Sequence, residues 1–356
     1  MKTIATVVGA RPQFIKVAPV SKALADTGAI KEVLIHTGQH FDAGMSDVFF
    51  EELGLPKPDH HLEIHGGGHG AMTGAMLQKL EPVLEELRPD RVLVYGDTNS
   101  TLAGALVAAK LHIPVAHVEA GLRSFNRLMP EELNRIVADQ LSDLLFTSTD
   151  VATKNLEREG IAKSQIFQVG DVMYDAALQF SDAAASRRGL LDSYSVEPGR
   201  YVLATVHRAE NTDDSGRLRN IVTSLEAVAK EIPVLLPIHP RTTGRMKAAG
   251  LSFERVRTMP PVGYLDMAAL ESQAAVIATD SGGVQKEAFF YKVPCVTLRD
   301  ETEWVELVDL GWNRLASPSS PDLARTILQA LGRQGTHAQP YGDGKSARAI
   351  AQILAR

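Results

Sequence analysis

The sequence predicts an α/β fold in which two doubly wound domains face each other across a cleft. Short apolar segments alternate with amphipathic ones along the chain, as strands and helices do around parallel sheets. The alternation stops at residues 181–200, where small, polar and charged residues show no strong period, and then restarts. At 356 residues, two domains of ordinary size are favoured over one. We therefore expect a first domain at 1–172, a second at 173–344, and a final helix at 345–356 that packs back on the first.

The predicted elements of the first half are joined by short connections. A strand at residues 3–10 leads into the helix RPQFIKVAPVSKALAD, and the next strand begins KEVLIHTG. Helices are expected at 71–87 and 150–160, with further strands in LLFTST and IFQVG. Between them, the strands RVLVYGD and PVAHVE flank the helix TLAGALVAAKLH. This is a βαβ unit, so its strands should be parallel, with their carboxyl ends at one edge of the sheet.

Acidic residues gather at that edge. Asp97 follows the first of these two strands, Glu119 ends the second, and Pro130 opens a helix with Glu131 and Glu132 in its first turn. Open α/β sheets bind ligands at the carboxyl ends of their strands. A single acid there is more often a helix cap, but three acids that converge favour acid/base chemistry.

The turn GARPQF, after the first strand, predicts an anion site, because a helix N-terminus favours negative charge. Arg11 in the turn and Lys16 in the helix add positive charge. The turn lacks the second and third glycines of the dinucleotide fingerprint, so it does not predict a dinucleotide site. The histidines of HHLEIHGGGHG lie in a segment whose glycines favour a loop, and no cysteine supports them, so no metal is expected.

The second half restarts the alternation. Strands are expected in YVLATVHR, VLLPIHP, VRTMPP, AVIATD and PCVTLRD, with helices between them that include LRNIVTSLEAVAKEI and YLDMAALES. Polar groups again follow the strand ends. HRAEN supplies His207, Arg208 and Asn211, and IHPR supplies His239 and Arg241.

The most specific motif of the second half is DSGGVQKE, where a strand ends, a turn follows and a helix begins. Gly282 and Gly283 would let the backbone approach a phosphate, and the N–H groups at the helix N-terminus, after Ser281, would favour its charge. Glu287 could accept two hydrogen bonds from a ribose diol. A tight turn with a helix cap also needs glycine, but the basic residues expected at the same edge favour diphosphate binding.

The composition excludes several classes of protein. A net charge of −6, with no stripe of Lys and Arg, argues against nucleic-acid binding. No apolar run approaches membrane-spanning length, and MKTIATVVGARPQFIK predicts a strand and a helix rather than a signal peptide. Cys295, the only cysteine, is expected in a buried strand and cannot form a disulfide within the chain. We expect a cytoplasmic protein.

These residues together predict a cleft that holds a diphosphate from one half and presents carboxylates from the other. The diphosphate would be an anchored leaving group, and the carboxylates could move protons or stabilise a developing cation. Transfer of a sugar, hydrolysis of the bond and elimination across it all remain open from the residue types alone.

An ordered set of motifs narrows the choice. Over almost the whole chain, the sequence closely resembles the non-hydrolysing UDP-N-acetylglucosamine 2-epimerase family in GARPQFIK, TGQHFD, YGDTNST, HVEAGLRS, PEELNR, HRAEN, HPRT, TDSGGVQKE and RDETEW. The resemblance implies a glycosyltransferase-B-like fold of two Rossmann-like domains, a UDP-sugar substrate, a homodimer, and neither a nicotinamide cofactor nor a catalytic metal. It also implies inversion of sugar carbon 2 by anti elimination of UDP to a 2-acetamidoglucal, followed by addition of UDP to the opposite face.

The resemblance also implies roles for individual residues. Carboxylates move the protons and stabilise the cation, while Arg11, Lys16 and His207 hold the diphosphate. The DSGG turn binds phosphate, and Glu287 binds the ribose. The expected catalytic residues are Asp97, Glu119, Glu131, His207 and Lys16, and the expected substrate-binding residues are Arg11, Arg123, Arg208, Asn211, His239, Arg241, Ser281, Gly282, Gly283 and Glu287.

The chain departs from the family pattern in two places. Phe41, Asp42 and HGGGHG replace residues that serve an allosteric second nucleotide-sugar site in bacterial UDP-N-acetylglucosamine enzymes, and RDETEWVEL replaces RDTTERPE. These forms resemble the branch that acts on UDP-2,3-diacetamido-2,3-dideoxyglucuronate for O-antigen polysaccharides. The alternatives are therefore that uronate as substrate, a nucleotide-sugar glycosyltransferase, a hydrolysing relative that releases N-acetylmannosamine and UDP, and a sensor without catalysis.

Overall fold

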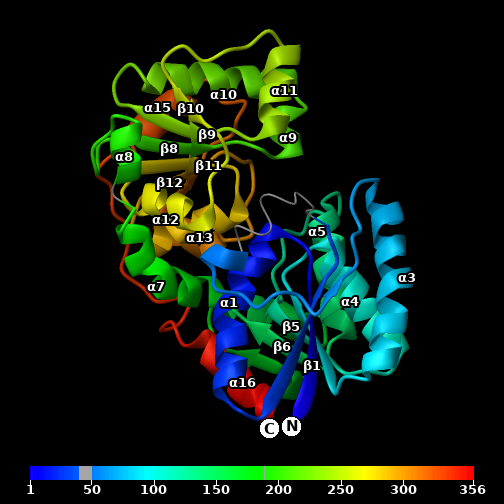
Figure 1. The fold of residues 1–356 in the computed structure, drawn as a ribbon. Helices are drawn as coiled ribbons and strands as arrows, with labels where there is room; N and C mark the ends of the chain where they lie inside the picture. The colour runs from blue at the N-terminus through cyan, green and yellow to red at the C-terminus, as the bar shows by residue number, and fades with distance from the viewer. Residues whose placement is uncertain (40–49, 188) are drawn as a thin grey trace. The chain divides into compact units, whose positions relative to one another are not determined.

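The computed structural model describes residues 1–39, 50–187 and 189–356, and the motif residues Phe41 and Asp42 lie outside that part. The described chain forms two compact units, residues 1–179 with 339–356, and residues 180–338 (Figure 1). The chain leaves the first unit within helix α7 (Val172–Ala185), at the start of which the sequence predicted the domain boundary. Each unit has one parallel sheet, and this confirms the predicted α/β class.

The sheet of the first unit has the strand order β3-β2-β1-β4-β5-β6-β7, and every neighbouring pair is parallel. Its strands are β1 (Lys2–Val8), β2 (Ile30–His36), β3 (His60–His61), β4 (Arg91–Tyr95), β5 (Val115–Ala120), β6 (Leu144–Thr147) and β7 (Ile166–Gln168). Its helices are α1 (Arg11–Asp26), α3 (His69–Leu87), α4 (Asn99–Lys110), α5 (Pro130–Leu141), α6 (Asp150–Arg158) and α16 (Ser346–Ala355).

One face of this sheet is covered by α3 and α4. Val7 and Val94 from the strands pack with Met76 and Leu80 of α3 in one apolar core. A Cβ on Gly104 of α4 would lie 2.9 Å from Val94 Cγ1, so glycine is what lets this helix lie directly on the strands.

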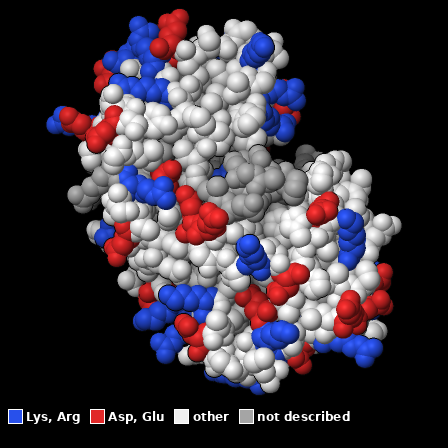
Figure 2. All heavy atoms as spheres, in the orientation of Figure 1, with Lys and Arg blue, Asp and Glu red and all other residues white. Residues whose placement is uncertain are grey.

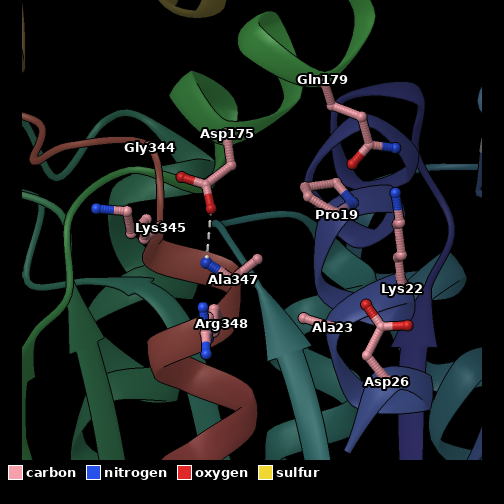
Figure 3. A pocket seen from close by; sticks show the side chains of 10 residues that line it. All are labelled: Pro19, Lys22, Ala23, Asp26, Asp175, Gln179, Gly344, Lys345, Ala347 and Arg348. Carbon is pink, nitrogen blue, oxygen red and sulfur yellow. Dashed lines mark hydrogen bonds between the residues drawn. The ribbon is translucent and has the colours of Figure 1, made fainter.

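The last helix, α16, packs against α1 of the first unit. Asp175 of α7 accepts hydrogen bonds from the backbone N–H groups of Ser346 and Ala347 at 3.2 and 2.8 Å, and so caps the N-terminus of α16 (Figure 3). At the other end of the helix, Lys2 Nζ donates to the Leu354 carbonyl at 3.3 Å. The cavity drawn in Figure 3, about 310 Å³ between α1, α7 and α16, is lined by none of the predicted site residues.

The sheet of the second unit has the strand order β10-β9-β8-β11-β12-β13, again all parallel. Its strands are β8 (Val202–Thr205), β9 (Val234–Pro237), β10 (Arg257–Met259), β11 (Val276–Thr279), β12 (Cys295–Thr297) and β13 (Asn313–Leu315). Its helices after α7 are α8 (Gly189–Ser193), α9 (Ala209–Thr212), α10 (Ser215–Val228), α11 (Pro240–Ala248), α12 (Tyr264–Ser272), α13 (Gly282–Phe290), α14 (Val305–Asp309) and α15 (Leu323–Leu328).

Both faces of the second sheet are buried. Val202 and Ala204 of β8 belong to one core, with Ile221 and Leu225 of α10, while Leu203 belongs to the core on the opposite face. Buried residues on both sides explain why such strands read as continuous apolar runs rather than as alternating ones.

The predicted strands and helices named above are all present, within a few residues at their ends. The prediction that Cys295 lies in a buried strand is confirmed. The sequence did not predict β3, β13, α9, α14 or α15, which contain two to six residues each, because so short an element carries no periodicity. The 14-residue helix α7 was also not predicted, and its last five residues lie in the segment 181–200 that was expected to be a linker. Within the described residues, no helix combines the length and the hydropathy that crossing a membrane needs. On the face in Figure 2, basic and acidic side chains are interspersed.

Candidate active site

In each sheet the strand order reverses at one point, and such points are where open α/β sheets bind ligands. In the first unit the reversal lies between β1 and β4, and in the second between β8 and β11. Arg11 and Asp97 follow the strands at the first point, and His207 and Ser281 follow those at the second. The topology therefore places predicted residues of both halves at the expected edge of their own sheet.

Lys16 and Glu119 form a buried ion pair in the first unit. Glu119 lies at a β-bulge in β5 with a φ of 70°, in the left-handed region that non-glycine residues rarely adopt. Backbone strain of this kind is concentrated at functional sites. A Cβ on Gly96, which has a φ of +62°, would lie 3.0 Å from Lys16 Nζ and 3.3 Å from Glu119 Oε2. The ion pair is thus packed on the backbone just before Asp97.

Asp97 is held by helix α5. Arg135 donates from Nη2 to Asp97 Oδ2 at 2.7 Å and from Nη1 to Glu132 Oε2 at 2.9 Å. Glu132 also accepts from the backbone N–H groups of Ser124 and Phe125, both at 2.9 Å, so this carboxylate holds a loop in place. The neighbouring Glu131 is half-buried in the first turn of the same helix.

A buried network that the sequence analysis did not identify supports the same edge. His117 Nε2 lies 2.7 Å from the Gly96 carbonyl, which can only accept, so this nitrogen donates. His117 Nδ1 lies 2.7 Å from Asp139 Oδ1, and Asp139 Oδ2 accepts from Arg123 Nη1 at 2.7 Å. Arg123 also donates to Glu159 from Nε and Nη2 at 2.7 and 2.6 Å.

Arg123 was predicted to bind substrate, and the structure gives its side chain internal partners and an exposed fraction of 1%. Burial lowers the pKa of Arg123, but the hydrogen bond to Glu159 and the charge of Asp139 outweigh it and hold the pKa above its usual value. The only feature of the sequence that could have indicated this buried network was His117, two residues before Glu119 in the same strand.

In the turn after β1, two backbone N–H groups donate to a side chain of the same chain. Gln13 Oε1 accepts from the N–H groups of Gly9 and Ala10 at 2.8 and 3.1 Å, and Gln13 Nε2 donates to the Tyr95 carbonyl at 2.9 Å. These two N–H groups are therefore engaged within the chain.

Asp280 organises the corresponding edge of the second unit, and the sequence analysis assigned it no role. Its buried carboxylate accepts from the backbone N–H groups of His207 and Arg208, both at 3.0 Å, and from Asn211 Nδ2 at 3.1 Å. His207 Nδ1 lies 3.1 Å from Asp280 Oδ1. Burial would raise the pKa of Asp280, but these hydrogen bonds and the charge of His207 hold the pKa below its usual value.

The other predicted groups from β8 and β9 lie close to these. Asn211 is fully buried and also donates to the Leu298 carbonyl at 3.0 Å, so its side chain joins two loops. His239 caps α11, and the centroid of its ring lies 6.3 Å from that of His207. Arg241 Nε donates to Thr212 Oγ1 at 3.0 Å.

The two glycines of the DSGG turn have different surroundings. A Cβ on Gly282 would lie 2.6 Å from Glu303 Oε1, so a carboxylate of the chain itself already requires glycine there. The nearest described atom to a Cβ on Gly283 is Glu287 Oε2, at 3.8 Å. The chain's own side chains therefore require glycine at 282 but not at 283.

Behind Glu287 lies a second carboxyl group, Glu271 of α12. Glu271 is fully buried, and neither of its oxygens has a hydrogen-bond partner among the described residues. Burial, reinforced by the charge of Glu287, raises the pKa of Glu271 well above its usual value. No group of three or more His, Cys, Asp or Glu residues in the described part of the chain could hold a metal ion.

The class that the two sheets and their switch points define is that of enzymes with the glycosyltransferase-B-like fold. Within this class, the chain belongs to the UDP-N-acetylglucosamine 2-epimerase family, whose sequence model matches residues 22–355. The chain is accordingly an isomerase, and the predicted family is confirmed.

Individual relatives are similar over their whole length. The chain is 53% identical to a UDP-2,3-diacetamido-2,3-dideoxy-D-glucuronate 2-epimerase of Pseudomonas aeruginosa, over 99% of both chains. A crystal structure of Methanocaldococcus jannaschii UDP-GlcNAc 2-epimerase in complex with UDP-GlcNAc and UDP matches with a TM-score of 0.93 and 44% identity, over 99% of both chains. The Neisseria meningitidis enzyme bound to UDP-GlcNAc matches with a TM-score of 0.91 and 30% identity, also over 99% of both.

Proposed function

We propose that this protein inverts carbon 2 of a UDP-2-acetamido sugar without hydrolysing it, by eliminating UDP and adding it back. The observation that carries the proposal is the Lys16–Glu119 ion pair on Gly96, beside Asp97, at the switch point of the first sheet. It sets a cation and a carboxylate against the residue that precedes Asp97, in a chain of the 2-epimerase family.

The proposed chemistry needs a carboxylate and a leaving group together. The proton on carbon 2 has no neighbouring carbonyl group, so its loss must be coupled to cleavage of the bond between carbon 1 and the diphosphate oxygen. A carboxylate takes the proton, the C–H electrons form the C1–C2 double bond, and UDP leaves with the electrons of the broken bond. UDP then adds back to carbon 1 while a proton is delivered to the opposite face of carbon 2.

In this scheme, Asp97, Glu119 and Glu131 move protons and stabilise positive charge at carbon 1. Lys16 acts beside Glu119, where its charge favours the ionised carboxylate and the departing diphosphate. Burial lowers the pKa of Arg11 against the charge of Glu52, yet a guanidinium stays protonated and can hold the same anion.

The second unit would bind UDP. The turn Ser281–Gly283 receives phosphate at the N-terminus of α13, His207 contacts the diphosphate, and Glu287 binds the ribose. Arg208, His239 and Arg241 complete the binding edge. The internal contacts of Arg123 and Asn211 support positioning roles for these two residues, one in each unit.

The relative with 53% identity favours UDP-2,3-diacetamido-2,3-dideoxyglucuronate as the substrate. A role in the synthesis of O-antigen polysaccharide is proposed from the resemblance of RDETEWVEL and HGGGHG to that branch. The archaeal relatives, such as the 44% identical enzyme of Methanocaldococcus jannaschii, support UDP-N-acetylglucosamine as the other candidate. We also propose that the enzyme is a cytoplasmic homodimer, as the family resemblance and the single cysteine suggest.

Proton NMR in deuterium oxide tests the function, with each candidate substrate offered separately. The expected result is deuterium at carbon 2 of the product with UDP still attached, and the substrate that exchanges identifies the branch. Asp97→Asn and Glu131→Gln should slow exchange about a hundredfold or more, whereas Glu85→Gln, an exposed carboxylate on α3, should not.

Three outcomes would overturn the proposal. An acceptor-dependent product without deuterium at carbon 2 would indicate a glycosyltransferase, and free N-acetylmannosamine with UDP would indicate hydrolysis. UDP binding without turnover of either sugar would indicate a sensor.

A further inference from the structure

Four charged side chains of alternating sign form a ring at the carboxyl edge of the second sheet. They belong to two segments. Arg208 and Glu210 lie after β8, at the start of α9, and Arg299 and Glu303 lie in the loop after β12. The ring is Arg208–Glu303–Arg299–Glu210. Gly282, the first residue of α13, packs against the Glu303 carboxylate. The ring therefore adjoins the turn to which we assign phosphate binding.

Arg299 is the most deeply buried member, with an exposed fraction of 1%. Its Nη1 donates to Glu303 Oε2 at 2.8 Å, and its Nε lies 3.7 Å from Glu210 Oε1. Leaving water is unfavourable for a guanidinium, so a buried one needs such carboxylate partners. Because Arg299 donates to Oε2 of Glu303, the carboxylate group is oriented and the position of its other oxygen, Oε1, is fixed.

That oxygen, Glu303 Oε1, faces Gly282 and Arg208. Arg208 Nη2 lies 4.0 Å from it, and Arg208 Nη1 lies 3.9 Å from Glu210 Oε1. Both distances allow charge attraction but exceed hydrogen-bond length. Across the described residues, the side chain of Arg208 donates no hydrogen bond that would have to break before it could donate to a phosphate. The two carboxylates thus hold the guanidinium in place and leave its donors available.

We propose that Arg299 is a positioning residue for the diphosphate of the substrate, acting through Glu303 on Arg208. Arg299 fixes Glu303, Glu303 and Glu210 hold Arg208 beside Gly282, and Arg208 donates to the diphosphate. This inference rests on the proposed function, because the function supplies the UDP group that Arg208 would contact.

The test compares the binding of UDP with that of uridine, which lacks the phosphates, to the full-length protein by ligand-observed NMR. In Arg299→Met, the Kd for UDP should rise at least tenfold while the Kd for uridine changes less than twofold. Arg299→Lys keeps the charge and should recover part of the UDP affinity. A structural defect would weaken both ligands, so the ratio of the two Kd values isolates the positioning role.

Two further variants distinguish loss of UDP binding from misfolding. Arg299→Met leaves Glu303 buried without its partner, so the double variant Arg299→Met/Glu303→Leu replaces the whole pair by apolar groups of similar size. It should melt near the wild-type temperature and still lose UDP affinity selectively. Asp300→Asn is the matched control, because Asp300 lies in the same loop and pairs outward with Arg217 at 2.7 Å. It should change neither Kd.

Equal weakening of UDP and uridine in the folded double variant, or no weakening of either, would overturn the positioning role while leaving the proposed function intact. A wild-type protein that binds neither ligand would overturn both proposals.

Discussion

Replacing Asp280 by Ala should destabilise the second unit by about 4 kcal/mol, because one buried and two partly buried donors lose their acceptor. The donors are the N–H groups of His207 and Arg208 and the side-chain amide of Asn211. Each stranded donor costs about 1–3 kcal/mol, and water entering the space of the lost carboxylate keeps the sum near the lower end. Asp280→Asn keeps one acceptor oxygen, so it should cost about half as much.

Tryptophan fluorescence is the appropriate assay, because the only tryptophans, Trp304 and Trp312, both lie in the second unit. For a unit of this size, about 4 kcal/mol corresponds to a fall in melting temperature of roughly 8–16 °C. A lowered folded-state pKa means that Asp280 stabilises the fold above its unfolded pKa and that this contribution is lost as pH falls through the folded pKa. The acid side of the stability profile should therefore be shallower in Asp280→Ala. A loss below about 1 kcal/mol with an unchanged acid profile would refute the reasoning.

Three further changes test other parts of the structure. Wild-type stability, read by tryptophan fluorescence, should fall as pH rises through the raised pKa of Glu271, and Glu271→Gln should abolish that fall; parallel profiles would contradict the assignment. Gly9→Ala would place a Cβ 1.9 Å from Thr37 Oγ1 and should cost about 1–3 kcal/mol by thermal unfolding, where an unchanged melting temperature would count against the close packing. Lys16→Met leaves Glu119 without its cation and should slow deuterium exchange at carbon 2 by about a hundredfold; a rate within threefold of wild type would exclude the proposed role.

The sequence predicted the sheets well because their strands carry long apolar runs and the connecting helices carry a clear period. It also placed Asp97, Glu119 and His207 correctly at strand ends, since the carboxyl ends of parallel strands share an edge. What could not be predicted is which of these groups pair with one another. The contact between Lys16 and Glu119 joins residues far apart in the chain, and Glu119 lies at a bulge that no local motif predicts.

Some polar residues at strand ends have partners within the chain. Arg123, Asn211 and Asp280 all lie in motifs that suggest ligand binding, yet each is buried against other parts of its own unit. Residue type and spacing do not distinguish a side chain that meets a ligand from one that holds the loop which does, because both need the same charge at the same edge. The distinction depends on burial and on partners, which only the folded chain defines.

The return of the chain to α16 has a consequence for the order in which the protein can fold during synthesis. Residues 180–338 form the second unit from one continuous stretch, which can close as soon as it has left the ribosome. The first unit must wait, because Asp175 and Lys2 find their partners only in the last eleven residues. The half that is made first is therefore completed last, and a stop codon before Ser346 would remove α16 from the unit that carries Asp97 and Glu119 while leaving residues 180–338 whole.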